Sequence, residues 1–268
     1  MEPMGVVLDT VANLHSGPDT VKDVVTQAAL GTSLAVEITC DGWLYVRMAD
    51  DYHGWIEGRL VRLLDPDEPP YASFGRVGEV RTLMPFLYTV PDGVSRAPAG
   101  RVTLGVRMPI VEEQEDWTLV ELPDRARLWM RAGDLALVDP AAPRPRRGIE
   151  AVLDTARRLL GVPYLFGGTT PLGIDCSGFV QLVYRLNGVQ LLRDSRIQFT
   201  DPRLVPVGRD ALQAGDLIFF GRERVTHVGL CLGAPEFIHA TSWRVPAVQI
   251  SSLEELHWTE LFLGARRP

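Results

Sequence analysis

Short runs that alternate apolar and polar residues, separated by turn residues, occupy the first 65 positions of the chain. One run, residues 33–38, follows Gly31, and a second, residues 44–48, follows Asp41-Gly42. A third run, residues 54–56, begins at a glycine. Alternation with a period of two predicts half-buried strands, and several short strands at this spacing are typical of a small barrel. Residues 1–65 are therefore expected to form a small β-barrel.

A weaker repeat of this pattern follows in residues 66–140. Apolar, aromatic and turn positions recur in the same order, although few residues are identical. Such internal repetition predicts two tandem β-barrels. The matching stretches are 104–111 with 33–38, 116–120 with 41–45, and 127–130 with 54–56.

Residues 148–268 have a different character. Apolar residues recur at helical spacing over 149–160, and Gly161 is a typical helix stop. A second helix is expected from Cys176 to Asn187-Gly188. Strand-like runs follow these helices, which predicts an α+β domain with an antiparallel sheet. The expected strands are 216–220, 225–232, 236–241 and 247–250, and the proline-rich stretches 66–70 and 139–148 are expected to be linkers.

Composition narrows the classes of function. The formal net charge of −7 over 268 residues argues against nucleic acid or an anionic membrane as a partner. No run approaches the ~18 apolar residues of a membrane helix, and residues 1–10 do not resemble a signal peptide. Three cysteines are too few for a disulfide framework. A monomeric cytoplasmic protein is expected, with Cys40 and Cys231 as buried structural residues.

Cys176 is the first candidate for chemistry. Asp175 is a natural N-cap, which places Cys176 in the first turn of the second helix. Backbone N–H groups and the helix dipole both favour negative charge there, so a thiolate nucleophile is expected.

His227 and His239 are the candidate partners of this thiol. Their strands are joined by a short turn, and a hairpin centred at Gly233 puts both imidazoles on one face of the sheet. His227 then suits the role of base and His239 that of its orienting partner. Two alternatives stay open: purely structural residues, or a metal site made of Cys176 and the two histidines. His15, His53 and His257 receive no role.

Five motifs in the third segment resemble those of the NlpC-type cell-wall cysteine peptidases, which have a papain-like α+β fold. The resemblance implies Cys176 as nucleophile, His227 as base, His239 as orienter and Tyr164 as oxyanion ligand. No metal or cofactor is implied. One departure is Phe166, where a Trp is more usual, and it concerns the shape of the pocket. The motifs are 164–168, 175–180, 215–220, 226–229 and 237–240.

The whole chain resembles the γ-D-glutamyl-L-diamino acid endopeptidases, in which two bacterial SH3-like domains precede the peptidase. The stretch Arg193-Asp194-Ser195-Arg196-Ile197-Gln198 resembles a motif that lines the site in those enzymes. The resemblance implies that Asp194 binds the free amine of the substrate. Tyr52, in a stretch where His53 replaces the usual Pro, is implied to reach the same pocket. The expected substrate-binding residues are Tyr52, Asp175, Ser177, Asp194 and Ser195.

The expected organisation is an SH3-like domain over 1–65, a second over 66–140 and a peptidase domain over 148–268. The resemblance implies a cysteine endopeptidase that cuts murein peptides between D-Glu and the diamino acid and requires a free N-terminal L-Ala, in cell-wall peptide recycling. The alternatives are an amidase or acyltransferase on the same fold, and a wall-binding protein without catalysis.

Overall fold

The computed structural model describes residues 3–94 and 96–268, and the chain divides into two compact units, Met1–Pro143 (unit 1) and Arg144–Pro268 (unit 2). The division falls within the proline-rich stretch 139–148, where the chain forms neither helix nor strand before residue 149. Within the described residues, no helix is both long and apolar enough to cross a membrane.

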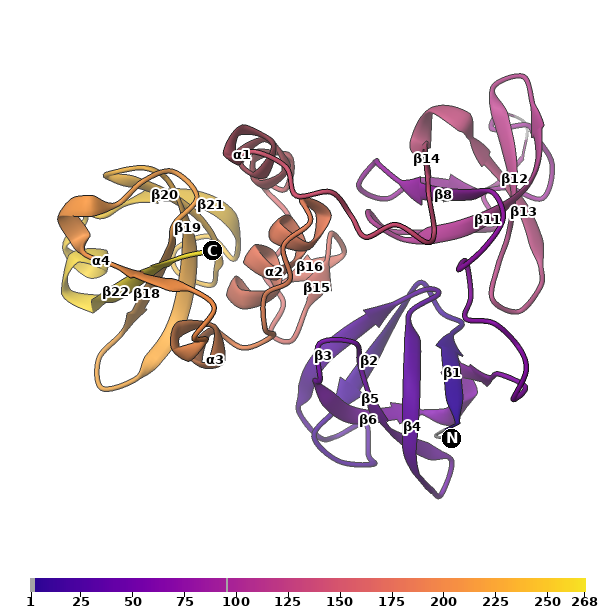
Figure 1. Ribbon diagram of the computed structural model, residues 1–268, viewed down its shortest axis with the longest axis horizontal. Helices are drawn as coiled ribbons and strands as arrows, with labels where there is room; N and C mark the ends of the chain where they lie inside the picture. The colour runs from indigo at the N-terminus through magenta and orange to yellow at the C-terminus, as the bar shows by residue number, and fades with distance from the viewer. Residues whose placement is uncertain (1–2, 95) are drawn as a thin grey trace. The chain divides into compact units, whose positions relative to one another are not determined.

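The first sheet of unit 1 is antiparallel and is built from short alternating runs (Figure 1). Its inward positions include Leu14, Leu34, Val46 and Ile56, which are fully buried together. The sheet order is β3 (Val24–Ala29), β2 (Val11–His15), β6 (His53–Glu57), β5 (Trp43–Arg47), β4 (Ser33–Cys40), β1 (Met4–Val7) and β7 (Val61–Leu63), with the 3-10 helix η1 (Gly58–Leu60) between β6 and β7.

The turn between β4 and β5 confirms the prediction made from Asp41-Gly42. Cys40 pairs with Trp43, so the loop holds two residues, and both have positive φ (46° and 82°). That backbone matches the twist of a hairpin and favours Asp-Gly. Cys40 is partly exposed beside this turn, so its expected burial is wrong, whereas Cys231 is buried as expected.

The second sheet of unit 1 repeats the strand order β6-β5-β4-β1-β7 of the first. The predicted strand 104–111 is wrong in its bounds. Gly105 has φ 84° and makes a turn, so the strand begins at Arg107. The order is β13 (Arg127–Arg131), β12 (Trp117–Glu121), β11 (Arg107–Gln114), β8 (Val77–Val80) and β14 (Leu135–Val138), with η2 (Ala132–Asp134) before β14 and a small pair β9 (Phe86–Leu87) and β10 (Gly100–Arg101).

Unit 2 is an antiparallel sheet with helices packed against it (Figure 1). The two predicted helices and the four predicted strands are present, with ends shifted by at most two residues. The sheet order is β17 (Val205–Val207), β22 (Phe262–Arg267), β18 (Leu217–Gly221), β19 (Val225–Gly233), β20 (Glu236–Thr241) and β21 (Ala247–Ser252). The other elements are α1 (Ile149–Arg158), α2 (Cys176–Leu186), α3 (Ser195–Thr200), α4 (Leu256–Leu261), η3 (Arg209–Ala211) and the pair β15 (Thr169–Thr170) and β16 (Gly173–Ile174).

Both faces of this sheet are covered. Val228, Leu230 and Ile238 are fully buried on one face, and α2 packs against β19 and β20. The opposite face carries an apolar cluster that includes Phe220 and Phe237, together with Trp258 from α4. The middle of β19 is therefore held from both sides, which fixes the side chains that it presents.

Candidate active site

Cys176 is the first residue of α2, as the sequence predicts. Asp175 has extended backbone angles, and its carboxylate accepts the Gly178 N–H at 2.7 Å, which makes it the N-cap. The Cys176 sulfur accepts hydrogen bonds from the backbone N–H groups of Ser177 and Val228. The hydrogen bond from Val228 places the thiol against β19. Val228 directly follows His227 in that strand.

The two histidines lie diagonally across the β19–β20 hairpin. Leu230 pairs with Ile238 and Cys231 with Phe237, so the hairpin is centred one residue beyond the predicted Gly233. The same-face prediction is confirmed because His227 Nε2 lies 2.7 Å from His239 Nδ1.

Ser251 extends this contact onto a third strand. His239 Nε2 lies 3.1 Å from Ser251 Oγ, and Ser251 pairs with Phe237 in the β20–β21 ladder. The chain His227, His239, Ser251 thus crosses β19, β20 and β21. No local pattern in the sequence points to Ser251, since only the register of β21 against β20 brings it to His239.

Packing holds the two imidazoles in place. Trp258 stacks on His227 with centroids 5.3 Å apart and meets His239 edge-on at 4.8 Å. Gly229 is two residues after His227 on β19 and faces His239 across the hairpin. A Cβ there would come within 2.7 Å of the Phe237 ring and 3.3 Å of the His239 Cβ. No sequence pattern points to Trp258, because α4 is a helix of only six residues and shows no clear periodicity.

Burial controls the protonation of these groups. Cys176 is 8% exposed, and burial raises the pKa of its thiol to about 12, with a smaller contribution from the Asp175 charge. His227 retains some exposed surface, yet burial of its ring lowers its pKa to about 4. The pKa of fully buried His239 is lowered well below its usual value. These shifts leave both imidazoles uncharged near neutral pH and oppose the thiolate that the helix N-terminus favours. The expected thiolate stays a prediction.

Tyr164 lies beside the start of α2, where it forms a bridge with Ile174. Burial, and then the proximity of Cys176, raise the pKa of its phenol to about 12. The hydroxyl therefore keeps its proton and can donate a hydrogen bond to a developing anion.

These positions can be set beside known proteins. The sequence profile of the NlpC/P60 family matches residues 161–267, and that of the bacterial dipeptidyl-peptidase Sh3 domain matches residues 14–68. Gamma-D-glutamyl-L-lysine dipeptidyl-peptidase of Bacillus cereus is 28% identical over 258 residues, which cover 90% of this chain and 74% of that protein. The probable endopeptidase NlpC homolog of Haemophilus influenzae is 31% identical over 159 residues, which cover 59% of this chain and 84% of that protein. The chain belongs to the NlpC/P60 family.

A solved structure agrees in fold. The crystal structure of an NlpC/P60 family protein from Bacillus cereus superposes with a TM-score of 0.86 at 24% identity, covering 98% of this chain and 99% of that one. The predicted resemblance is thus confirmed at the level of a cell-wall peptidase family: an NlpC/P60 domain preceded by a β-rich region with an SH3-like domain.

A buried ion pair fixes the first turn of α2 in the NlpC/P60 domain. Arg193 is 2% exposed and donates to both carboxylate oxygens of Asp175, at 3.0 and 2.7 Å. It also donates to Ser177 Oγ at 2.9 Å, and the Gly167 N–H donates to Asp175 at 3.0 Å. Asp175 and Ser177 are thus bonded to protein groups, and their expected contact with substrate stays a prediction. The part played by Arg193 was not anticipated.

The motif after Arg193 forms the start of α3. Asp194 is the N-cap residue and is partly exposed, while Ser195 is buried. Gln198 donates to the Leu192 carbonyl at 2.7 Å and so ties α3 to the preceding loop. Tyr52 lies in unit 1, on the loop between β5 and β6. The roles expected of Asp194, Ser195 and Tyr52 stay predictions.

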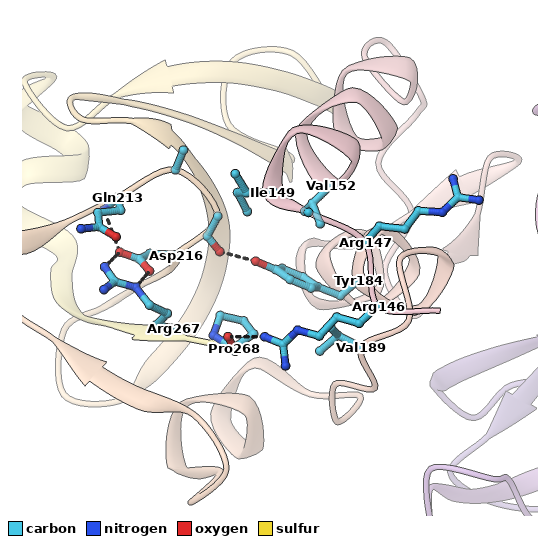
Figure 2. Close-up of a pocket in the computed structure, with 13 residues that line it drawn as sticks. Arg146, Arg147, Ile149, Val152, Tyr184, Val189, Gln213, Asp216, Arg267 and Pro268 are labelled. Atoms are coloured by element: carbon cyan, nitrogen blue, oxygen red, sulfur yellow. Dashed lines mark hydrogen bonds and ion pairs between the residues drawn. The ribbon is translucent and has the colours of Figure 1, made fainter. Parts of the chain in front are cut away.

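A pocket of the NlpC/P60 domain is separate from these residues (Figure 2). It lies where the start of α1 meets the last strand, and none of the expected site residues lines it. Asp216 in this pocket accepts two hydrogen bonds from Arg267, at 2.7 and 2.8 Å, and Tyr184 donates to the Gly215 carbonyl. The bonds from Arg267 hold the end of β22 against the loop before β18, and the bond from Tyr184 ties α2 to the same loop. In the described part of the chain, no group of three or more His, Cys, Asp or Glu residues is placed to hold a metal ion.

Proposed function

We propose that this NlpC/P60 protein is a cysteine endopeptidase that hydrolyses the γ-D-glutamyl–diamino acid bond of murein peptides carrying a free N-terminal L-Ala. The observation that carries the proposal is the placement of Cys176 at the start of α2, with its sulfur accepting a hydrogen bond from the backbone N–H of Val228, the residue after His227. Similarity over 90% of the chain to a gamma-D-glutamyl-L-lysine dipeptidyl-peptidase supports the choice of bond.

Acylation begins from a neutral pair. His239 engages Nε2 of His227, which leaves Nδ1 to take the proton of the thiol. As the proton moves, the Cys176 sulfur attacks the γ-carbonyl carbon of D-Glu, and the carbonyl oxygen becomes an oxyanion. The N–H of Cys176 and the protonated hydroxyl of Tyr164 donate to that oxygen.

Collapse of this intermediate breaks the amide bond. The imidazolium of His227 returns its proton to the leaving amine of the diamino acid, and an acyl-enzyme remains on Cys176. Water then gives its proton to His227 and attacks the thioester, which releases the carboxylate product and restores the thiol. His239 orients His227 throughout.

Recognition of the amine end is assigned to the α3 motif. We propose that Asp194 pairs with the ammonium of L-Ala, that Ser195, Ser177 and Asp175 complete the subsite, and that Tyr52 contributes from unit 1. A charge-assisted hydrogen bond of this kind is among the stronger ones. A site that encloses the amine excludes stem peptides still attached to glycan through L-Ala, so released peptides in wall recycling are the proposed substrates.

We also propose that residues 66–140 form a second SH3-like domain between a first over 1–65 and a peptidase domain over 148–268. The repeated strand order of the two sheets in unit 1 supports this, as do the 3-10 helices at equivalent places. Monomeric behaviour of the protein stays a prediction.

Mass spectrometry tests the function. L-Ala-γ-D-Glu-diaminopimelate is incubated with wild-type protein and with Cys176→Ala, and its N-acetylated form with wild type. We expect wild-type protein to release L-Ala-D-Glu from the free peptide. We expect no release by Cys176→Ala, and none from the N-acetylated peptide. Equal cleavage of the acetylated peptide would reject the amine pocket. Efficient release of peptides from intact sacculi would reject the recycling role, and cleavage by Cys176→Ala would reject the thiol mechanism.

A further inference from the structure

Ser251 closes a line of hydrogen-bonding groups behind the proposed base. His227 Nε2 and His239 Nδ1 are 2.7 Å apart, and His239 Nε2 and Ser251 Oγ are 3.1 Å apart. His239 is fully buried, and its other neighbours include the rings of Phe237 and Trp258. Those rings offer no acceptor at hydrogen-bonding distance, so the environment of His239 Nε2 is defined by Ser251.

The two imidazoles are coupled in their tautomers. Both are neutral, because burial lowers the pKa of His227 and of His239, and each ring therefore carries one N–H. A single proton lies between the two rings, on Nε2 of His227 or on Nδ1 of His239. Choosing one position fixes the remaining nitrogen of each ring, so the pair has two states.

Only one state suits the proposed chemistry. His227 can accept the thiol proton at Nδ1 only if its own proton is on Nε2, where it donates to His239 Nδ1. His239 must then carry its proton on Nε2, and that N–H needs an acceptor. The Ser251 hydroxyl oxygen is at the right distance to accept it. In the other state the same hydroxyl can donate to the bare Nε2, so Ser251 contacts His239 in both states.

We propose that Ser251 is a positioning residue that accepts the Nε2–H of His239 in the productive state and so holds His239 in place behind the base. This inference rests on the proposed function, since that function defines which tautomer is productive. Ser251 acts through His239. The role resembles that of the third triad member, which orients the catalytic imidazole through a hydrogen bond.

Three variants test the proposal. Ser251→Ala removes the acceptor, Ser251→Thr keeps a hydroxyl in a residue that suits a strand, and Ser252→Ala is the matched control. Ser252 is the next residue of β21, and its hydroxyl accepts the Glu254 N–H, away from the histidines. With one hydrogen bond lost, kcat/KM of Ser251→Ala is expected to fall by about 5- to 20-fold, mainly in kcat. Ser251→Thr and Ser252→Ala are expected to stay within about 3-fold of wild type.

Nitrogen-15 NMR of histidine-labelled protein reads the tautomers directly. The chain has five histidines, so assignment by substitution is practicable. In wild type, His227 and His239 are expected as Nε2–H tautomers, and Ser251→Ala is expected to move the His239 Nε2 resonance, which loses its acceptor, whereas Ser252→Ala leaves it in place. An unmoved His239 Nε2 resonance in Ser251→Ala would overturn the proposal, as would equal losses of rate in Ser251→Ala and Ser252→Ala. If the wild type cleaves no murein peptide, the proposed function fails, whereas the NMR result still decides what Ser251 does.

Discussion

At the scale of single residues, the protonation of Cys176 is set by two opposed influences. The start of α2 and two backbone N–H groups stabilise a thiolate, whereas burial and the Asp175 charge oppose it, and the pKa is raised to about 12. With the pKa raised in this way, the attack proposed above transfers the thiol proton to His227 as the sulfur attacks, without an ion pair beforehand. The base must then be neutral, and the lowered pKa of His227 ensures this near neutral pH.

The pH dependence of alkylation tests this account. Only the thiolate reacts with iodoacetamide, so with a pKa near 12 its rate at Cys176 is expected to rise about tenfold per pH unit from about pH 6 to 9. Rates are measured by peptide mapping, with Cys176→Ala to account for Cys40 and Cys231. A rate that is already constant above about pH 5 would mean a preformed thiolate–imidazolium pair and would contradict the protonation described here.

Arg193 offsets the charge that most disfavours the thiolate. Replacing it in Arg193→Met leaves the buried Asp175 carboxylate unpaired, and we expect a loss of about 3–5 kcal/mol in the free energy of unfolding. Because Arg193 also lowers the pKa of Cys176, alkylation at fixed pH should slow. Urea unfolding and alkylation measure the two effects. Arg196→Met, on the exposed side of α3, is the control, and equal effects of both variants would remove the special role of Arg193.

At the scale of elements, the β19–β20 pair can hold His239 beside His227 because Gly229 has no side chain that would collide with it. In Gly229→Ala the added Cβ meets the Phe237 ring at 2.7 Å and the His239 Cβ at 3.3 Å, so the His239 ring must shift. We expect a loss of about 1–3 kcal/mol in stability and a drop in kcat of at least tenfold, because the base is displaced.

The control for this substitution is Gly208→Ala, where nothing lies within 4 Å of the added Cβ and the backbone (φ −73°) suits alanine. Thermal unfolding and steady-state kinetics of both variants are compared. Full activity of Gly229→Ala would show that the position of His239 tolerates such a shift and that its contact with His227 is not needed.

The elements that the sequence predicts are those with local signals. Asp175 caps α2, and an alternating run marks β19. Positions 227 and 239 fall on one face of the sheet once a tight hairpin turn is placed midway between them. The remaining site residues depend on contacts that no local pattern records. Ser251 requires the β20–β21 register, and Arg193 reaches Asp175 over eighteen positions of the chain. The burial that opposes a thiolate at Cys176 likewise depends on the packed fold, which no local pattern records.

At the scale of the whole molecule, the chain holds two compact units, with two buried clusters in unit 1 and a separate one in unit 2 among the described residues. In unit 2, the last strand, β22, lies in the interior of the sheet between β17 and β18. The sheet is therefore complete only when the C-terminal residues have joined it. Asp216 is 1% exposed and fastens this strand by accepting from Arg267 and from the Gln213 N–H at 2.8 Å.

Calorimetry of Asp216→Ala tests both the fastening and the independence of the units. The substitution strands the Gln213 N–H and releases Arg267, and we expect about 2–3 kcal/mol less stability in unit 2. Two separate compact units predict two thermal transitions. The midpoint of the unit 2 transition should fall by roughly 5–15 °C, while that of the unit 1 transition stays unchanged. Asp210→Ala, at an exposed position of η3, should move neither. A shift of both transitions together in Asp216→Ala would mean that the units unfold as one cooperative body, and loss of β22 would then be felt throughout the chain.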